Sequence, residues 1–291
     1  MEVFEKTGDV EYMHTIPRYG RFRIVLMKQR NGWEITVRLV PIEILKFAAT
    51  GMPTSCAGLI KWSQGIILIT GPAGCGKSST LSTFVEMINQ RRYEHIITLE
   101  NPIEIFYESK LCQITQREIN THTMSQISAL RSALREDPDV IVISELRDLK
   151  TIQLAITAAE TGHLVLGTMN TINAVQTISR LIDSFPTDEQ QVTRNLIAES
   201  LRGVICQQLI PKKDGAGMVV AYEVLLNTPS VANNIRKGTI GQIENLMTTG
   251  VSSGMVLLNS SLQTLVTNNI ISAEEAKERK THTYFNKEEV Y

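Results

Sequence analysis

One short stretch of this sequence constrains the fold more than any other, because it joins a strand pattern to a helix pattern through a glycine-rich loop. Residues 71–80 read GPAGCGKSST and fit the pattern G-x-x-x-x-G-K-[ST]. The apolar run at 65–70 predicts a short buried strand before them. After them, apolar side chains recur at the spacing of one helix face, at Leu81, Phe84, Val85 and Ile88. Strand, loop and helix in this order are the geometry of a phosphate-binding loop.

The chemistry expected of this loop follows from its backbone. N–H groups and the positive end of the following helix point into such a loop and favour phosphate oxygens. Glycine lets the chain wrap closely around a phosphate, because a Cβ atom would clash there. Lys77 is expected to reach the β- and γ-phosphates of ATP, and the Ser78 hydroxyl to hold Mg²⁺. The predicted nucleotide-binding residues of the loop are Gly71, Gly74, Cys75, Gly76, Lys77, Ser78 and Ser79.

The bulk composition indicates an ordinary globular protein. Of the 291 residues, 43% are hydrophobic, and the formal net charge of −1 gives no general reason to expect nucleic acid as a partner. No apolar run approaches the ~18 residues that span a bilayer, and the first residues lack the layout of a signal peptide. The cysteines are scattered without a C-x-x-C pair, which favours a cytoplasmic protein with reduced thiols and argues against structural zinc.

The beginning of the chain predicts a small β-rich unit. Residues 20–27 and 33–40 are rich in strand-forming side chains, and they flank Asn31-Gly32, a strong hairpin signal. Alternation places the apolar residues of the second run on one face: Trp33, Ile35, Val37 and Leu39. A hairpin is marginal by itself. We therefore expect this unit to pack against its own chain or against a neighbouring one.

From residue 65 the pattern alternates between strands and helices, which predicts a parallel sheet covered on both faces. The predicted strands are 65–70, 95–100, 140–144, 163–168 and 218–226, with a short edge strand at 112–117. Glu145 and Asp148 follow the apolar strand at 140–144. Because ligands of open α/β sheets bind at the carboxyl ends of strands, these carboxylates are candidates for chemistry. A helix N-cap or a solvated side chain is the structural alternative for each of them.

The predicted helices carry two boundary signals. Residues 123–126 read TMSQ and predict a capping box that starts a helix. Residues 272–275 read SAEE and predict a second capping box among short helices that follow Pro229. Between them, apolar spacing predicts one long amphipathic helix that carries Val192, Leu196, Leu201, Val204 and Ile205.

Four further stretches together resemble the secretion ATPase superfamily, specifically the type IV pilus retraction ATPases (PilT type). They are TLENPIE at 98–104, RSALREDPD at 131–139, VIVISELRD at 140–148 and AAETGHLVLGTMNT at 158–171. The resemblance runs from about residue 20 to about residue 276. It implies an α/β fold with a RecA-like P-loop NTPase core, a small truncated PAS-like N-terminal domain and a helical C-terminal part. The domain boundaries expected on this basis are 1–50, a linker at 51–60, and an ATPase domain at 61–291.

The resemblance also implies roles for individual residues. Glu104 falls on the catalytic carboxylate of the family, and Glu145 on the glutamate that coordinates Mg²⁺ through water or polarises the attacking water. Lys77 contacts the phosphates, and His163 belongs to a histidine motif that contributes to the nucleotide site. Arg30 and Arg38 lie where the N-terminal domain supplies arginines to the γ-phosphate of a neighbouring subunit.

The function implied by the resemblance is that of a motor. Members of the family form homohexameric rings in which ATP hydrolysis drives domain rotation beneath an inner-membrane platform protein. We therefore expect an ATPase that powers pilus retraction and twitching motility, located in the cytoplasm at the inner-membrane base of the pilus machine. Other pilus ATPases are further expected partners. Extension-type ATPases carry a four-cysteine zinc motif that the cysteine spacing here excludes.

Some residues depart from the family pattern and leave alternatives open. Asn101 replaces an aspartate, Asn170 replaces a histidine, Ser144 replaces a glycine, and Ala232 replaces an arginine of the retraction motif. These replacements are compatible with a reduced rate of ATP hydrolysis. One alternative is a degenerate paralogue that binds ATP and regulates a pilus or secretion ATPase ring with little turnover. A DNA-translocating motor is another alternative, which the balanced net charge argues against only weakly.

Overall fold

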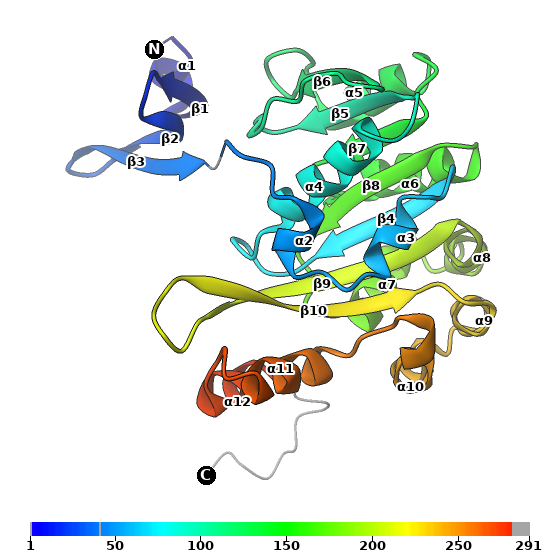
Figure 1. The fold of residues 1–291 in the computed structure, drawn as a ribbon. Helices are drawn as coiled ribbons and strands as arrows, with labels where there is room; N and C mark the ends of the chain where they lie inside the picture. Colours follow the sequence, from blue (N-terminus) through cyan, green and yellow to red (C-terminus); the bar gives the residue numbers. More distant parts are fainter. Residues whose placement is uncertain (1, 41, 281–291) are drawn as a thin grey trace.

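The computed structural model describes residues 2–40 and 42–280, which form a small N-terminal unit and a larger α/β body (Figure 1). The N-terminal unit is a three-stranded antiparallel sheet in the order β1-β2-β3, preceded by a short helix. Its elements are α1 (Glu2–Thr7), β1 (Asp9–Ile16), β2 (Gly20–Gln29) and β3 (Gly32–Val40). The predicted hairpin is confirmed, since β2 and β3 are joined through Arg30 and Asn31.

The N-terminal sheet is thin, and it packs against its own chain at a defined place. Side chains on β3 such as Ile35 and Val37 remain more than half exposed. Arg21 of β2 is nonetheless buried, because its Nη2 atom donates to the Ile103 carbonyl at 2.6 Å and its guanidinium lies 3.9 Å from the centre of the Phe106 ring. The contact joins the N-terminal sheet to the segment that follows β5 in the larger body.

The larger body is built on a seven-stranded sheet in the order β10-β9-β4-β8-β7-β5-β6. Its strands are β4 (Gly65–Thr70), β5 (His95–Glu100), β6 (Gln113–Glu118), β7 (Val140–Ile143), β8 (Leu164–Met169), β9 (Leu201–Pro211) and β10 (Met218–Leu226). Strand β10 runs antiparallel to β9, and the other neighbouring pairs are parallel. The predicted parallel sheet is confirmed, with β6 at its edge.

Helices cover both faces of this sheet (Figure 1). Those that pack on it are α2 (Phe47–Thr50), α3 (Cys56–Leu59), α4 (Lys77–Asn89), α5 (Gln126–Ala133), α6 (Leu149–Glu160), α7 (Ala174–Asp183) and α8 (Gln190–Ser200). Along β4, Ile66 and Leu68 belong to one apolar layer, whereas Ile67 and Ile69 belong to the other. This period of two is that of a strand buried on both faces. Each fully buried aliphatic side chain contributes about 1.5–3 kcal/mol by leaving water.

The end of the described chain is helical, as expected. Its elements are α9 (Pro229–Lys237), η1 (Ile240–Gln242), α10 (Ile243–Thr249), η2 (Gly250–Ser253), α11 (Leu258–Thr267) and α12 (Ala273–Arg279). The cap at Ser272 is confirmed, because its side chain accepts from the Glu275 N–H group. Within residues 2–40 and 42–280, the helices are all too short or too polar to cross a bilayer.

Two predictions were wrong. The helix predicted across residues 192–205 ends at Ser200, and the next residues enter the middle of the sheet as β9. Val204 and Ile205 fit either pattern locally, and only pairing with β4 and β10 decides for the strand. The helix start predicted at 123–126 is also displaced, since Ser125 caps α5 by accepting from the Ser128 N–H group.

Gly203 allows β9 to pack closely, and replacing it tests this arrangement. A Cβ atom there would lie 2.9 Å from the Leu225 carbonyl oxygen and 2.9 Å from a methyl carbon of Leu59. We expect Gly203→Ala to lower the free energy of unfolding by about 1–3 kcal/mol, measured by urea denaturation. Gly241→Ala is the matched control, because a Cβ atom there meets no heavy atom within 4 Å. Equal losses in both variants would contradict the close packing of β9.

Candidate functional site

The glycine-rich loop lies at the carboxyl end of β4 and leads directly into α4, as the sequence predicts. Gly71, Gly74 and Gly76 have φ angles of 141°, 77° and 93°, which residues with a Cβ atom rarely adopt. A Cβ atom on Gly71 would also lie 2.3 Å from the Gln207 carbonyl oxygen and 2.6 Å from the Cys75 sulfur. The loop therefore needs glycine both for its backbone angles and for its close approach to β9.

The Lys77 side chain folds back over this loop. Its Nζ atom donates to the carbonyl oxygens of Gly71 at 2.7 Å and Pro72 at 2.9 Å. Burial lowers the pKa of the Lys77 amine, while the nearby Cys75 and Glu145 side chains act in the opposite direction. An anion in the loop would add to that opposing effect. The ammonium therefore lies among loop oxygens at the place where it can meet phosphate oxygens.

Cys75 lies within the loop but does not have the properties of a reactive thiol. Its side chain is buried, and burial raises the pKa of the thiol, while the charge of Lys77 opposes the shift. The thiolate is the reactive form of cysteine. The side chain therefore acts as a small buried group, and the Cys75 N–H group donates to the Pro72 carbonyl within the loop at 3.3 Å.

Glu145 lies one residue beyond Ser144 at the end of β7, next to the end of β8. Its Oε1 atom accepts a hydrogen bond of 2.6 Å from Asn170 Nδ2, and its Oε2 atom is 2.7 Å from Arg147 Nη2. Gln126 Nε2 donates to the backbone oxygen of Glu145 at 2.8 Å. Because β7 and β8 are parallel neighbours, their carboxyl ends bring Glu145 and Asn170 together. Asn170, which departs from the family pattern, thus orients the predicted catalytic carboxylate.

Asp148 has a structural role. It caps α6, because its Oδ1 atom accepts from the Thr151 N–H group at 3.0 Å and its Oδ2 atom accepts from the Thr151 hydroxyl at 2.7 Å. Of the two carboxylates that follow β7, Glu145 is the one whose charge acts on Lys77 of the loop.

Glu104 lies in the segment after β5 and faces the N-terminal sheet. Its Oε1 atom is 3.7 Å from Arg23 Nη1, an ion pair between the two units of the chain. Glu100, at the end of β5, accepts from the Thr98 hydroxyl at 2.6 Å and from Gln116 Nε2 at 3.0 Å. Burial raises the pKa of Glu100 in spite of these two donors. Two carboxylates with different surroundings therefore lie at the end of β5 and in the segment that follows it.

The two arginines predicted to reach a γ-phosphate lie at opposite ends of β3. Arg38 Nη2 is 3.9 Å from the position of a Cβ atom on Gly74 of the same chain. Arg30 lies in the turn that precedes β3, eight residues before Arg38, which corresponds to about 26 Å along an extended chain. The structure therefore brings Arg38 to the loop of its own chain, and it does not bring Arg30 there.

His163 also lies away from the loop. Its backbone oxygen accepts from the Gly65 N–H group at 3.0 Å, at the amino end of β4, whereas the loop follows the carboxyl end. The six residues of β4 separate these ends by about 20 Å. The His163 Nδ1 atom lies 3.0 Å from the Ala158 carbonyl oxygen. The prediction that His163 contributes to the nucleotide site is therefore not supported at the loop of its own chain.

One residue that contacts the loop is not predicted from the sequence. Gln207 on β9 is 1% exposed, and its Nε2 atom donates to the Cys75 carbonyl at 2.7 Å. Its Oε1 atom accepts from the Thr80 hydroxyl at 2.9 Å. The apolar spacing predicts a helix that carries Leu201, Val204 and Ile205, and this helix gives no reason to place Gln207 beside the loop. The signal that could have revealed it is a pair of glutamines that interrupts an otherwise apolar run.

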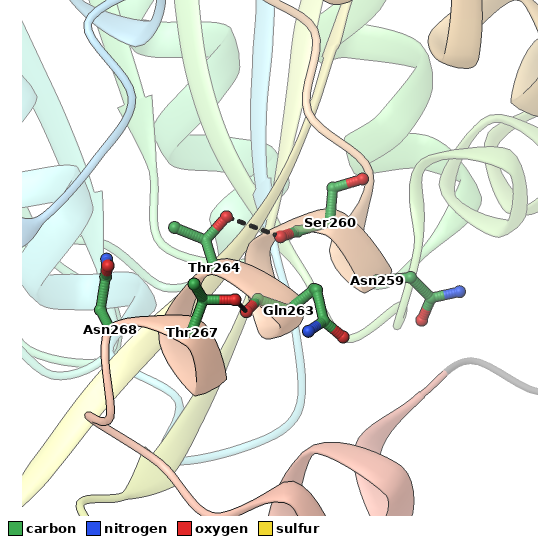
Figure 2. Close-up of a pocket in the computed structure, with 6 residues that line it drawn as sticks. All are labelled: Asn259, Ser260, Gln263, Thr264, Thr267 and Asn268. Atoms are coloured by element: carbon green, nitrogen blue, oxygen red, sulfur yellow. Dashed lines mark hydrogen bonds between the residues drawn. The ribbon is translucent and has the colours of Figure 1, made fainter.

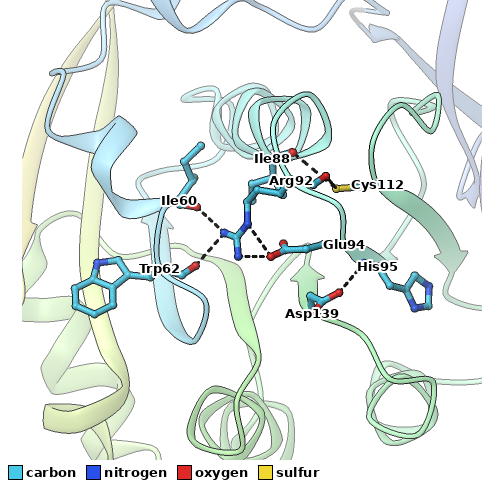
Figure 3. Close-up of polar contacts among 8 residues, drawn as sticks. All are labelled: Ile60, Trp62, Ile88, Arg92, Glu94, His95, Cys112 and Asp139. Atoms are coloured by element: carbon cyan, nitrogen blue, oxygen red, sulfur yellow. Dashed lines mark hydrogen bonds and ion pairs between the residues drawn. The ribbon is translucent and has the colours of Figure 1, made fainter.

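Two other polar regions lie outside this site. Figure 2 shows a pocket along α11 lined by uncharged polar side chains: Asn259, Ser260, Gln263, Thr264, Thr267 and Asn268. These groups offer no general acid or base. Figure 3 shows Arg92, which pairs with Glu94 and donates to the carbonyls of Ile60 at 2.7 Å and Trp62 at 3.0 Å. This cluster links the segment before β4 to the start of β5, which is a structural role.

Comparison with known proteins assigns a family to this arrangement. A family model described as "Type II/IV secretion system protein" matches residues 9–288. The chain is 42% identical over 276 residues to the "Type IV pilus retractation ATPase PilT" of Pseudomonas aeruginosa, covering 95% of this chain and 80% of that protein. It is 41% identical over 278 residues to a "Twitching motility protein" of Neisseria gonorrhoeae, covering 96% and 74%.

A solved structure has the same fold. It is described as the crystal structure of the pilus retraction motor PilT with bound ADP, and it matches with a TM-score of 0.89 at 39% sequence identity. The match covers 97% of this chain and 80% of that one. The expected fold, an α/β ATPase core with a small N-terminal sheet, is therefore confirmed.

Glu100 provides a test of the electrostatics at the end of β5. Burial raises the pKa of Glu100 above the ordinary value of 4.5, so the ionised carboxylate lowers the free energy of unfolding at neutral pH. Below pH 4.5 the carboxylate is protonated in both the folded and the unfolded state, and this destabilisation is absent. Glu100→Gln keeps an oxygen for both donors and cannot ionise. We expect its urea midpoint to exceed that of the wild type at pH 7, and the difference to vanish as the pH falls toward 4.5. The exposed Glu108→Gln is the control, and a pH-independent difference for Glu100→Gln would contradict the explanation.

Proposed function

The chain belongs to the type II/IV secretion system protein family, and we propose that it is a motor ATPase that drives the retraction of a type IV pilus. The observation that carries the proposal is the meeting of Lys77, Glu145 and the glycine-rich loop at one edge of the sheet. The proposal includes a ring of six copies that works in the cytoplasm, beneath an inner-membrane platform protein. Other pilus ATPases are proposed as further partners.

ATP binding begins with the loop. The loop N–H groups and the positive end of α4 attract the β- and γ-phosphates. Lys77 exchanges the carbonyl oxygens of Gly71 and Pro72 for phosphate oxygens, a charge-assisted contact that favours the protonated amine. Binding therefore offsets the effect of burial on the pKa of Lys77.

The residues present fit a Mg²⁺ ion held jointly with the nucleotide. Among the described residues there is no group of three or more His, Cys, Asp or Glu side chains that could hold a metal ion. Mg²⁺ commonly uses one or two protein oxygens together with substrate phosphates and water. Ser78 at the start of α4 and Glu145 would be its protein-side groups. When bound, the ion neutralises charge on the phosphate oxygens.

Glu145 is the proposed base that orients the attacking water. Asn170 and Arg147 each hold one of its oxygens, which limits rotation of the carboxylate. The hydrogen bond to Glu145 raises the pKa of Arg147, so the contact favours the protonated guanidinium. Glu104 is the second carboxylate proposed to act at this edge. Arg38, beside Gly74, would stabilise charge on the phosphoryl group during transfer.

Hydrolysis is proposed to move the N-terminal sheet relative to the core. Arg38 reaches the loop from β3, and Arg21 and Arg23 of β2 contact the segment that carries Glu104. Loss of the γ-phosphate removes negative charge beside Arg38. The balance of contacts between the two units therefore depends on the state of the nucleotide, and this dependence would couple chemistry to force.

Replacement of Glu145 tests the enzymatic proposal. Loss of a positioned proton-transfer group typically lowers a rate by about 10²–10⁴-fold. We expect Glu145→Gln to lower the Mg²⁺-dependent ATPase rate by that order while ATP binding persists, and the exposed Asp188→Asn to retain the wild-type rate. Equal background rates in the wild type and Glu145→Gln would instead favour the alternative, a paralogue that binds ATP and regulates a ring with little turnover.

Mixed assemblies test which chain supplies Arg38. The Lys77→Ala and Arg38→Ala variants are each expected to be inactive alone. If Arg38 acts on the loop of its own chain, rings that contain both variants have a defect at every site, and phosphate release stays at background. If a neighbouring chain supplied Arg38, some sites would combine an intact Lys77 with an intact Arg38. Recovery of activity in co-expressed, doubly tagged assemblies would therefore contradict the geometry described here.

A further inference from the structure

Gln207 lies against the glycine-rich loop because β9 is longer than β4. The parallel pairing of these strands ends at Thr70 and Cys206, and the next residue after each is Gly71 and Gln207, respectively. The Gln207 carbonyl oxygen would lie 2.3 Å from a Cβ atom on Gly71, so the two backbones are in close contact. Strand β9 therefore packs directly against the first residue of the loop.

Both polar atoms of the Gln207 side-chain amide form hydrogen bonds. Its Nε2 atom donates to the Cys75 carbonyl at 2.7 Å, and its Oε1 atom accepts from the Thr80 hydroxyl at 2.9 Å. Both Gln207 and Thr80 are buried, so neither bond competes with water. One side chain thus joins the loop to the first turn of α4.

The bond to Cys75 controls the direction of a neighbouring donor. In a trans peptide the carbonyl and the following N–H group point in opposite directions. Because Gln207 holds the Cys75 oxygen against β9, the Gly76 N–H group must point away from β9. Gly76 adopts a φ of 93°, and a Cβ atom there would lie 3.2 Å from Gln207 Nε2. Backbone N–H groups at a helix N-terminus are the donors that bind phosphate.

From this geometry we infer that Gln207 is a positioning residue that holds the phosphate loop in its binding conformation and thereby sets the affinity for Mg·ATP. The inference rests on the proposed function, since it assumes that the loop binds a nucleotide. Gln207 does not touch the nucleotide in this scheme. It acts through the Cys75–Gly76 peptide, with Thr80 fixing the orientation of its amide.

Replacement of Gln207 by methionine is the direct test. Methionine has similar length and offers no amide, so both hydrogen bonds are lost while the volume is retained. We expect the dissociation constant for Mg·ATP, measured by isothermal titration calorimetry, to rise about tenfold, and the KM to rise more than kcat falls. Gln208→Met is the matched control, because successive side chains of a strand point to opposite faces. Its affinity is expected to equal that of the wild type.

Two further variants separate the hydrogen bonds. Gln207→Glu keeps an acceptor for Thr80, and its ionised carboxylate cannot donate to Cys75, so its affinity is expected to fall at least as far as that of Gln207→Met. Thr80→Val removes only the other bond and is expected to have a smaller effect. Gln207→Glu also keeps a polar group at this buried position, so it provides a test if Gln207→Met does not fold.

The outcomes are distinguishable. Wild-type affinity in folded Gln207→Met or Gln207→Glu, with only a lower melting temperature, would overturn the inference and leave a purely structural role. Equal weakening in Gln208→Met would overturn it as well, because the effect would not depend on contact with the loop. Failure of the wild-type protein to bind Mg·ATP would overturn the proposed function itself, and the inference with it.

Discussion

The parallel pairing of β4, β7 and β8 is the constraint on which the site depends. Parallel neighbours end at the same edge of a sheet, and residues far apart in the sequence therefore meet there. The loop follows β4, Glu145 follows β7, and Asn170 follows β8. Apolar layers on both faces hold these strands in register. The geometry of the site is thus a consequence of how the core is packed.

Burial at this edge disfavours charged side chains, and specific partners offset part of this effect. Burial lowers the pKa of Lys77 and raises the pKa of Glu100, so both groups are shifted toward their neutral forms. Glu145 stays at the partly exposed rim, where Arg147 pairs with it. A triphosphate would bring the negative charge that favours protonated Lys77. Arg38 and Arg23, from the N-terminal sheet, add positive charge at the same edge, so the two units meet where the charge of the nucleotide would change.

Most of the site could be predicted from local sequence. The strand, loop and helix around Lys77 follow from residues that are neighbours in the chain, and Glu145 stands out because a wholly apolar strand precedes it. His163 belongs to a recognisable motif, yet its position at the start of β8 places it at the opposite end of the sheet from the loop. A motif identifies residues, whereas strand direction decides which end of the sheet they occupy.

The sequence by itself determined the phosphate loop, the alternation of strands and helices, and the acidic residue after β7, because each depends on local spacing and side-chain type. Only the tertiary structure decided that β9 is a strand, that its Gln207 supports the loop, and that Arg38 lies beside the loop of its own chain. These features depend on pairing between segments more than a hundred residues apart or on the packing of one unit against another. Local patterns carry no information about such contacts, because the same apolar spacing satisfies a helix or a strand until a partner is present.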